Sequence, residues 1–369
     1  MNQQSEKLSI REYVAIAMLM LGARATEDTP AMLYQNAKNA AWMLPLLSAA
    51  MFFIPFYLLV KTMSLFQGKN LFVVINQLLG KYLGFAIGLM IFIVSSFGIS
   101  FDSRSYTNII RIYYFSTTPI VVLYGIFFIV CAYGAKRGIQ QVGSVSYLIV
   151  FYVLFSMAFA FLISTQDSAI QSILPIWGPG IFEIMKKSSS NLNLLANFCL
   201  LTLLVPYFKS NKEFQKGTWI AYVFVSILLS VAMLFYISLF DQSLAGLGFP
   251  YHTLIRYISL GSYIPNLEIF FFFVWIMGTL IRFTVFIYIT AIMFGHLFKI
   301  KDFEYLIPTI AAIYFLIGLL PESPVETSAQ LKSLLGNLAG PMFAGISLIL
   351  WLTALIKGEF KHAKNKNSM

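Results

Sequence analysis

The feature that most constrains this chain is a series of long apolar blocks, each of about 18 or more residues with few charges. Blocks of this length are typical of membrane-spanning helices, whereas a soluble helix shows an apolar stripe on one face only. Hydrophobic residues make up 59% of the 369 residues and charged residues only 11%. A soluble domain carries about a quarter charged residues. The sequence therefore predicts an all-α polytopic membrane protein.

Ten membrane spans are predicted from the apolar blocks. The first is short and needs a continuation beyond Gly22 to cross the bilayer. The stretch 251–263 is amphipathic and is expected at the membrane surface, and a short surface helix is expected near 181–187. The predicted spans are 9–22 with a broken continuation 29–37, 40–60, 81–101, 119–135, 141–164, 191–208, 218–240, 267–297, 304–320 and 335–356.

Basic residues indicate the orientation, because cytoplasmic loops carry an excess of lysine and arginine. With ten spans and an internal N-terminus, 16 of the 25 basic residues fall on the inside or in the tail 357–369, which predicts two cytoplasmic termini. The net charge of +10 follows from this bias and indicates contact with anionic membrane lipid rather than nucleic acid. The inside set is Lys7, Arg11, Lys61, Lys69, Lys81, Lys136, Arg137, Lys209, Lys212, Lys216, Lys299, Lys301, Lys357, Lys361, Lys364 and Lys366.

Residues suited to covalent chemistry or metal binding are sparse. Cys131 and Cys199 lie in apolar runs, without the spacing of a disulfide or a metal site. The three histidines, His252, His296 and His362, are scattered along the chain. The sequence also has no phosphate-binding loop and no hydrolase motif. We therefore expect no enzymatic activity, no catalytic residue, no cofactor and no metal.

The spans divide into two groups of five, 9–164 and 191–356, joined by an external linker at 165–190. Because each half has an odd number of spans, the second half has the opposite orientation in the membrane. The division therefore predicts a five-plus-five inverted repeat in a single transmembrane domain. Transporters built in this way interrupt the first helix of each half near the membrane midplane. The expected breaks are the segment "GARATEDTP" that starts at Gly22 and the region around Pro206.

A broken helix inside a membrane leaves backbone N–H and C=O groups without partners, and lipid supplies none. The first break therefore predicts a cavity in which protein, ligand or water completes these bonds. Gly22 tolerates the change of chain direction, and Thr29 before Pro30 is the expected N-cap of the continuing helix. The positive end of that half-helix should face the cavity, which makes the break a candidate binding site.

Three charged residues occupy the first break, and two interpretations of them are possible. Arg24 lies three and four residues before Glu27 and Asp28, so it can pair with either acid and satisfy the break internally. Alternatively, Arg24 binds a carboxylate or phosphate of a ligand, or the two acids bind an ammonium group of a ligand. The spacing allows both a salt bridge and a ligand site.

Charges within two later spans point to the same polar centre. Arg282 lies deep within the eighth span, where an unpaired charge is costly, so its expected partner is Asp102 or an acid of the first break. Arg104 faces another side of the third span and lies near the outer surface, where its side chain can reach water. The alternative is a buried polar network with a purely structural role.

Several short motifs occur in an order that resembles the spore germinant-receptor B subunits, the endospore germination permeases. They are "MLGA" and "TPAMLYQNA" around the first break, "SFDSR" in the third span, "LLVPYF" in the sixth and "EIFFFFVW" at the start of the eighth. The chain length, the predicted spans and the short basic tail also fit. The resemblance therefore covers nearly the whole chain.

This resemblance implies the amino acid–polyamine–organocation transporter fold, which is LeuT-like, with broken first and sixth helices. It implies a protein of the inner membrane of the spore that recognises a small germinant, often an amino acid, in a complex with A and C subunits. By the family pattern the ligand lies at the two broken helices, against the third and eighth. The corresponding residues here are Gly22, Ala23, Arg24, Phe101, Asp102, Leu201, Thr202, Thr279 and Arg282.

The sequence departs from the family pattern at the first break. Many members have glycine where Arg24 stands and an apolar pair where Glu27 and Asp28 stand, so the resemblance does not identify the germinant. Two other functions are possible: an ion-coupled amino-acid transporter of the same fold, and a structural membrane subunit. Uptake of labelled amino acids would favour the transporter, and loss of assembly in Arg24→Ala and Arg282→Ala would favour the structural subunit.

Overall fold

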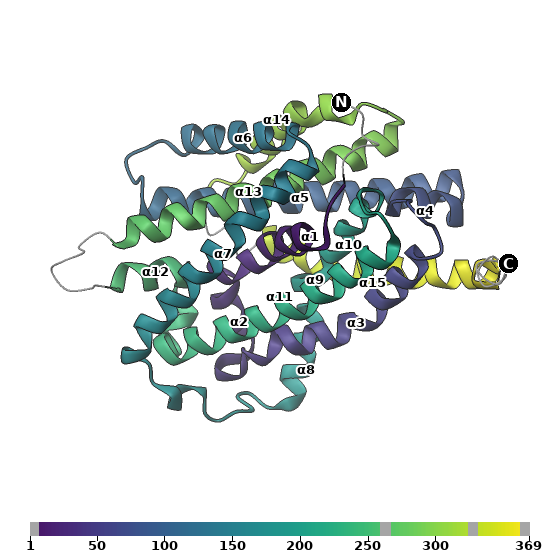
Figure 1. The fold of residues 1–369 in the computed structure, drawn as a ribbon. Helices are drawn as coiled ribbons and strands as arrows, with labels where there is room; N and C mark the ends of the chain where they lie inside the picture. Colours follow the sequence, from purple (N-terminus) through teal and green to yellow (C-terminus); the bar gives the residue numbers. More distant parts are fainter. Residues whose placement is uncertain (1–6, 259–266, 324–330, 362–369) are drawn as a thin grey trace.

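The computed structural model describes residues 7–258, 267–323 and 331–361, and every regular element within these ranges is a helix (Figure 1). Seven helical segments in these ranges are long and apolar enough to cross a membrane. Two shorter apolar segments, Ile120–Lys136 and Phe303–Gly318, accompany them. The prediction of an all-α membrane protein is confirmed, whereas the count of ten spans stays a prediction.

The helices follow the predicted spans, with additional short helices between them. The first part of the chain forms α1 (Ile10–Ala17), α2 (Thr29–Ala37), α3 (Met43–Met63), α4 (Leu71–Leu79), α5 (Lys81–Tyr113), α6 (Ile120–Lys136) and α7 (Ile139–Ser164). The rest forms α8 (Ile181–Ser190), α9 (Asn193–Ala196), α10 (Phe198–Leu201), α11 (Asn211–Phe240), α12 (Pro250–Tyr257), α13 (Leu267–Phe298), α14 (Ile307–Gly318) and α15 (Ser333–Ile356). α8 covers the position expected for a linker helix.

The first membrane segment is interrupted where the sequence predicts. After α1 the chain makes a wide π-turn over Met18–Gly22 and a tight 3-10 turn over Ala23–Thr26, and α2 then begins. The residue that precedes α2 is Asp28 rather than Thr29, so the expected cap is wrong by one position. Thr29 is the first helical residue, and its hydroxyl donates to Glu27 Oε1 at 2.9 Å instead of capping the helix.

The sixth predicted span, 191–208, is also interrupted. It consists of α9, α10 and a 3-10 segment, Thr202–Tyr207, that contains Pro206. Proline has no backbone N–H to donate, which limits regular helix at this point. Both predicted breaks are therefore present, although the second extends further towards the start of the span than the proline alone indicates.

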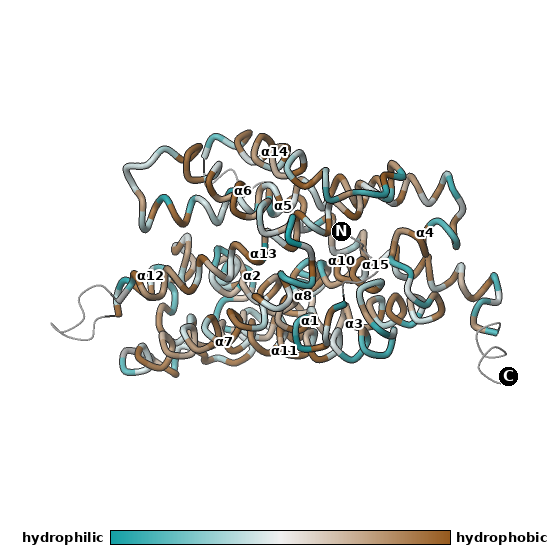
Figure 2. The backbone as a smooth tube through the Cα atoms, turned by 45° about the horizontal axis from the view of Figure 1, so that its top comes forward, coloured by the Kyte–Doolittle hydropathy of each residue, from teal (hydrophilic) through white to brown (hydrophobic). Residues whose placement is uncertain are grey.

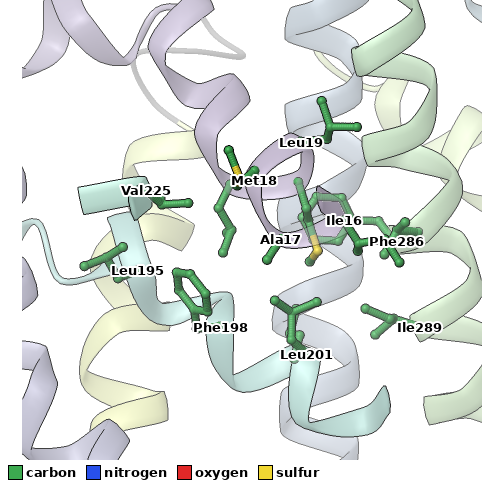
Figure 3. Packing of buried hydrophobic residues seen from close by; sticks show 14 of the residues in the cluster. Ile16, Ala17, Met18, Leu19, Leu195, Phe198, Leu201, Val225, Phe286 and Ile289 are labelled. Atoms are coloured by element: carbon green, nitrogen blue, oxygen red, sulfur yellow. The ribbon is translucent and has the colours of Figure 1, made fainter. Parts of the chain in front are cut away.

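Apolar side chains pack in the centre of the bundle, where α1 and the sixth segment come together. Figure 3 shows Ile16, Ala17, Phe198, Leu201 and Ile289 in one cluster of buried residues. Lipid tails are as apolar as these side chains, so membrane helices gain no hydrophobic free energy when they associate. Close packing therefore contributes much of the stability. Large apolar residues also lie on the outside of the bundle, and Figure 2 shows hydrophobic residues along most of the helices.

α12 covers the end of the bundle from which α13 starts, on the left in Figure 1. His252 and Ile255 on one face are fully buried, whereas Tyr257 on the other is 77% exposed. The His252 ring packs against Trp275 of α13, with ring centroids 4.4 Å apart. The expected surface stretch 251–263 is thus partly buried over its helical residues, and its positions from 259 onwards lie outside the described residues.

Candidate functional site

The carbonyl groups that the first break sets free are bonded by side chains of other helices. Three donors, from α5, α11 and α13, reach them. The bonds are Arg282 Nη1 to Met20 O at 2.6 Å, the Tyr106 hydroxyl to Ala23 O at 3.1 Å and the Tyr236 hydroxyl to Ala25 O at 2.8 Å. The break therefore faces protein rather than lipid, which is the condition under which irregular backbone persists at membrane depth.

An aromatic pair covers the same turn. The Thr26 hydroxyl donates to Ala23 O at 2.7 Å and accepts a hydrogen bond from Trp275 Nε1 at 3.0 Å. Trp275 in turn stacks on Tyr106, with ring centroids 5.7 Å apart. Because Trp275 also packs against His252 of α12, the turn is linked through this indole to the end of the bundle.

Five charged residues gather beside the break, and we call them the charge cluster. Lys332, the residue before α15, places its ammonium group among three carboxylates. Its Nζ atom lies 2.9 Å from Glu27 Oε2, 2.9 Å from Asp28 Oδ1 and 3.1 Å from Asp102 Oδ1. Asp102 Oδ2 also accepts a bond from Arg282 Nη2 at 2.5 Å. The structure thus contains the expected Arg282–Asp102 pair, while the role of Lys332 is not apparent from the sequence.

The charge cluster is largely shielded from water. The Arg282 side chain is fully buried, that of Glu27 is 2% exposed, and those of the other three members are 14% to 18% exposed. Buried charges persist only when each has a partner of opposite sign and good geometry. Arg282 has additional aromatic partners, with its guanidinium carbon 5.2 Å from the Tyr106 ring centre, 5.6 Å from that of Phe283 and 5.5 Å from that of Phe286.

Arg24 does not form the internal salt bridge that its spacing allows. Among the described residues, Glu27 and Asp28 both pair with Lys332, and neither pairs with Arg24. The backbone becomes extended at Glu27 (φ −109°, ψ −147°), so the helical spacing between Arg24 and the acids is lost. The Arg24 Nε atom is buried without a hydrogen-bond partner, which leaves a donor at the break for another group.

A small cavity lies beside the break, between the first segment, α7 and α13. Its volume is about 30 Å³, which exceeds the roughly 10–15 Å³ that one water molecule needs and is far below the roughly 300 Å³ of a small ligand pocket. Its walls are mainly apolar, with Leu154 and Met157 of α7 among them, and Thr26 and Thr279 contribute hydroxyl groups. Thr279 Oγ1 is buried without a partner. The cavity is too small for an amino acid in this conformation.

The structure distributes the nine predicted ligand-site residues over three places. Gly22, Ala23 and Thr279 line the cavity, Arg24 follows Ala23 in the chain without lining the cavity, and Asp102 and Arg282 belong to the charge cluster. The other three lie elsewhere. Leu201 packs in the apolar core (Figure 3), and the Thr202 hydroxyl donates to Cys199 O at 2.5 Å. The Phe101 ring packs against that of Phe97, with ring centroids 6.1 Å apart. Thr26 and Trp275 line the cavity without being expected there.

Arg104 does not reach the outer surface as the sequence suggests. Arg104 is only 7% exposed, and its guanidinium carbon lies 5.8 Å from the centre of the Tyr124 ring. Stacking on an aromatic face is an interaction that arginine makes readily in buried positions. The third span continues past this point to the end of α5, so Arg104 lies deeper in the bundle than the predicted span end at 101 indicates.

Comparisons with known proteins agree with this geometry. A family model described as "Spore germination protein" matches residues 7–327. Among the similar proteins of Bacillus subtilis (strain 168), spore germination protein KB is 20% identical over 305 residues, which cover 81% of this chain and 81% of that one. Spore germination protein B2 is 22% identical over 281 residues, which cover 74% of this chain and 75% of that one.

Two kinds of solved transporter share the fold. The structure of MhsT in complex with L-phenylalanine has a TM-score of 0.72 at 13% identity, over 93% of this chain and 88% of that one. The Eremococcus coleocola manganese transporter has a TM-score of 0.56 at 11% identity, over 93% of this chain and 75% of that one. At such identities the likeness shows the fold alone. These relatives are germination proteins and transporters, and none of them is an enzyme.

Proposed function

Since this chain belongs to the spore germination protein family, we propose that it is a germinant-receptor subunit that binds a small nutrient at the first break and triggers germination. The germinant is an amino acid or a similar polar solute. It acts without chemical conversion, as a ligand that changes the balance between two conformations of the receptor. The protein lies in the inner membrane of the spore with both termini in the cytoplasm, and A and C receptor subunits receive the signal.

The observation that carries this proposal is the small cavity at the break. Its apolar walls suit the side chain of an amino acid, and the unpartnered hydroxyl of Thr279 in its lining suits a carboxylate oxygen. The unpartnered Nε of Arg24, the residue after the lining residue Ala23, is a second donor at the break that suits a carboxylate. Because the cavity is now too small for such a ligand, binding requires an opening movement. A ligand that binds only the open form stabilises that form, and this is the physical basis of a signal.

The test is a germination dose–response in spores that carry this receptor alone, with the standard L-amino acids as probes and subunit abundance checked by immunoblot. Arg24→Ala is expected to raise the required concentration about tenfold or more, because a bond to a charged group contributes about 1.5–3 kcal/mol. Thr279→Val keeps the side-chain shape and is expected to raise it about three- to tenfold, by the loss of one neutral hydrogen bond.

Both variants should be present at normal abundance, since the Arg24 Nε and the Thr279 hydroxyl have no hydrogen-bond partner that either substitution would leave unpaired. Unchanged dose–response curves for both would contradict a ligand site at the break. Loss of the Arg24→Ala protein from the membrane would show instead that Arg24 has a structural role.

A second candidate function is ion-coupled amino-acid transport, and the likeness to solved transporters is the observation that favours it. An inverted-repeat transporter moves solute by exposing one central site to each side of the membrane in turn. Labelled amino acids in proteoliposomes test this directly. Uptake that depends on an ion gradient would support transport, whereas binding without uptake would support a receptor that only senses its ligand.

A further inference from the structure

A second and larger crevice lies far from the break, at the end of the bundle opposite α12. It has a volume of about 570 Å³ and is formed by α4, the first turn of α5 and the last turn of α13. Ligand pockets typically measure about 300–1,000 Å³. Figure 1 shows α4 at the right-hand end of the molecule and α12 at the left. The predicted orientation places this crevice at the cytoplasmic face of the membrane.

The rim of the crevice is positively charged. Lys81, the first residue of α5, and Lys299, the residue after the end of α13, both line it, and both are exposed. Asn76 and His296 add polar groups, and none of the residues that line the crevice is acidic. Two lysines without an opposing carboxylate create a positive potential, which favours an anionic occupant.

Apolar residues also line the crevice, and some of them are exposed on the outside of the bundle. Phe72 and Leu297 line it, together with Phe85, which is 41% exposed. Tyr82, also in the lining, is 86% exposed, a position typical of an aromatic residue at a membrane–water interface. An occupant that contacts both the lysines and the apolar residues has a charged head and an apolar tail.

The backbone at Lys299 provides an independent indication. α13 ends in a Schellman motif, in which the Ile300 N–H donates to Gly295 O at 2.8 Å and Lys299 adopts a left-handed conformation with φ 59°. Glycine is strongly favoured at such a position, because a Cβ atom is disfavoured there. Lysine adopts this conformation at some cost, and its side chain lines the crevice.

We propose that this crevice binds the headgroup of an anionic phospholipid. The lipid phosphate lies between the ammonium groups of Lys81 and Lys299, and the acyl chains run along Tyr82 and Phe85 into the bilayer. Basic pockets between membrane helices bind anionic headgroups in this manner. The site does not depend on the proposed germinant function, since it shares no residue with the cavity at the break.

The test is native mass spectrometry of the purified full chain with phosphatidylglycerol or phosphatidylcholine of identical acyl chains. The wild type should retain phosphatidylglycerol in preference. The double variant Lys81→Gln/Lys299→Asn should lose this preference by about 30-fold, because each basic residue near an anionic surface contributes a factor of about five. Asparagine tolerates the left-handed conformation at position 299, so the helix end is kept.

The matched control is Lys136→Gln/Lys212→Gln, which removes two exposed lysines outside the crevice and should keep the preference. Equal retention of the two lipids by the wild type would overturn the proposal. Equal loss in the double variant and the control would do so as well, because it would indicate a general surface charge effect. Displacement of the lipid by inorganic phosphate would show that a free anion, not a phospholipid, is the ligand.

Discussion

Lys332→Met is expected to destabilise the folded protein by about 3–5 kcal/mol, the range found when one partner of a buried ion pair is removed. Lys332 contacts carboxylates from the first break and from α5, so its loss leaves Glu27 and Asp28 without a cation and Asp102 with Arg282 alone. Methionine keeps an unbranched side chain as far as Cε and lacks only the ammonium group, which confines the change largely to the charge. The readouts are membrane abundance and the thermal unfolding of the purified protein.

A compensating variant tests this explanation. Adding Glu27→Gln and Asp28→Asn to Lys332→Met removes the two unpaired charges, so stability is expected to recover in large part. Lys186→Met on α8, whose lysine is exposed, serves as the control and should have little effect. Equal stability of Lys332→Met and Lys186→Met would contradict the role assigned to the charge cluster.

Arg282→Met is expected to have an effect at least as large, because this residue holds together groups from two other helical segments. Its Nη2 atom bonds Asp102 of α5 at 2.5 Å, and its Nη1 atom bonds Met20 O at the first break at 2.6 Å. Removing the fully buried guanidinium leaves a carboxylate and a carbonyl group with one partner fewer each, at a loss of about 3–5 kcal/mol. Thermal unfolding and membrane abundance again provide the measurement.

Two comparisons make the Arg282 result specific. Arg282→Lys keeps the charge but not the two-pronged geometry, so it should recover only part of the stability. Arg256→Gln breaks an exposed pair with Glu268, whose nearest atoms lie 3.9 Å apart, and should change stability by at most about 1 kcal/mol. If Arg282→Met and Arg256→Gln were equally stable, the buried pair would have no special role in the fold.

The sequence predicts the membrane class, the two breaks and an acidic partner for Arg282, with Asp102 among three candidates, because each follows from a strong local requirement. Apolar length indicates a span, proline and glycine indicate a break, and a charge deep in a span demands a partner. Lys332 escapes prediction because it lies just before a span, a position that is normally solvated. The available signal is a charge balance: the first break and α5 hold three acids, and Arg282 is a partner for only one of them.

The residues carried over from the family pattern are not all brought together in the structure, again for a physical reason. Position along a helix does not tell which face a residue presents when the helix is irregular. The chain changes from α-helix to 3-10 helix between Leu201 and Thr202, so the direction of each side chain depends on the exact winding. Gly22, Ala23 and Thr279 lie at the cavity, whereas Leu201 packs in the apolar core.

Thiol labelling of Thr279→Cys shows directly whether the germinant binds in the cavity at the first break. Position 279 is itself only 1% exposed, so the reagent reaches it when the cavity opens, as the proposal requires, and a bound amino acid then blocks it. The two native cysteines, Cys131 and Cys199, are fully buried outside the cavity and should give little background. Labelling is measured in membranes with and without each L-amino acid that triggers germination. We predict that an effective amino acid slows the labelling of position 279 and that an ineffective one does not. Equal labelling rates with effective and ineffective amino acids would contradict the claim.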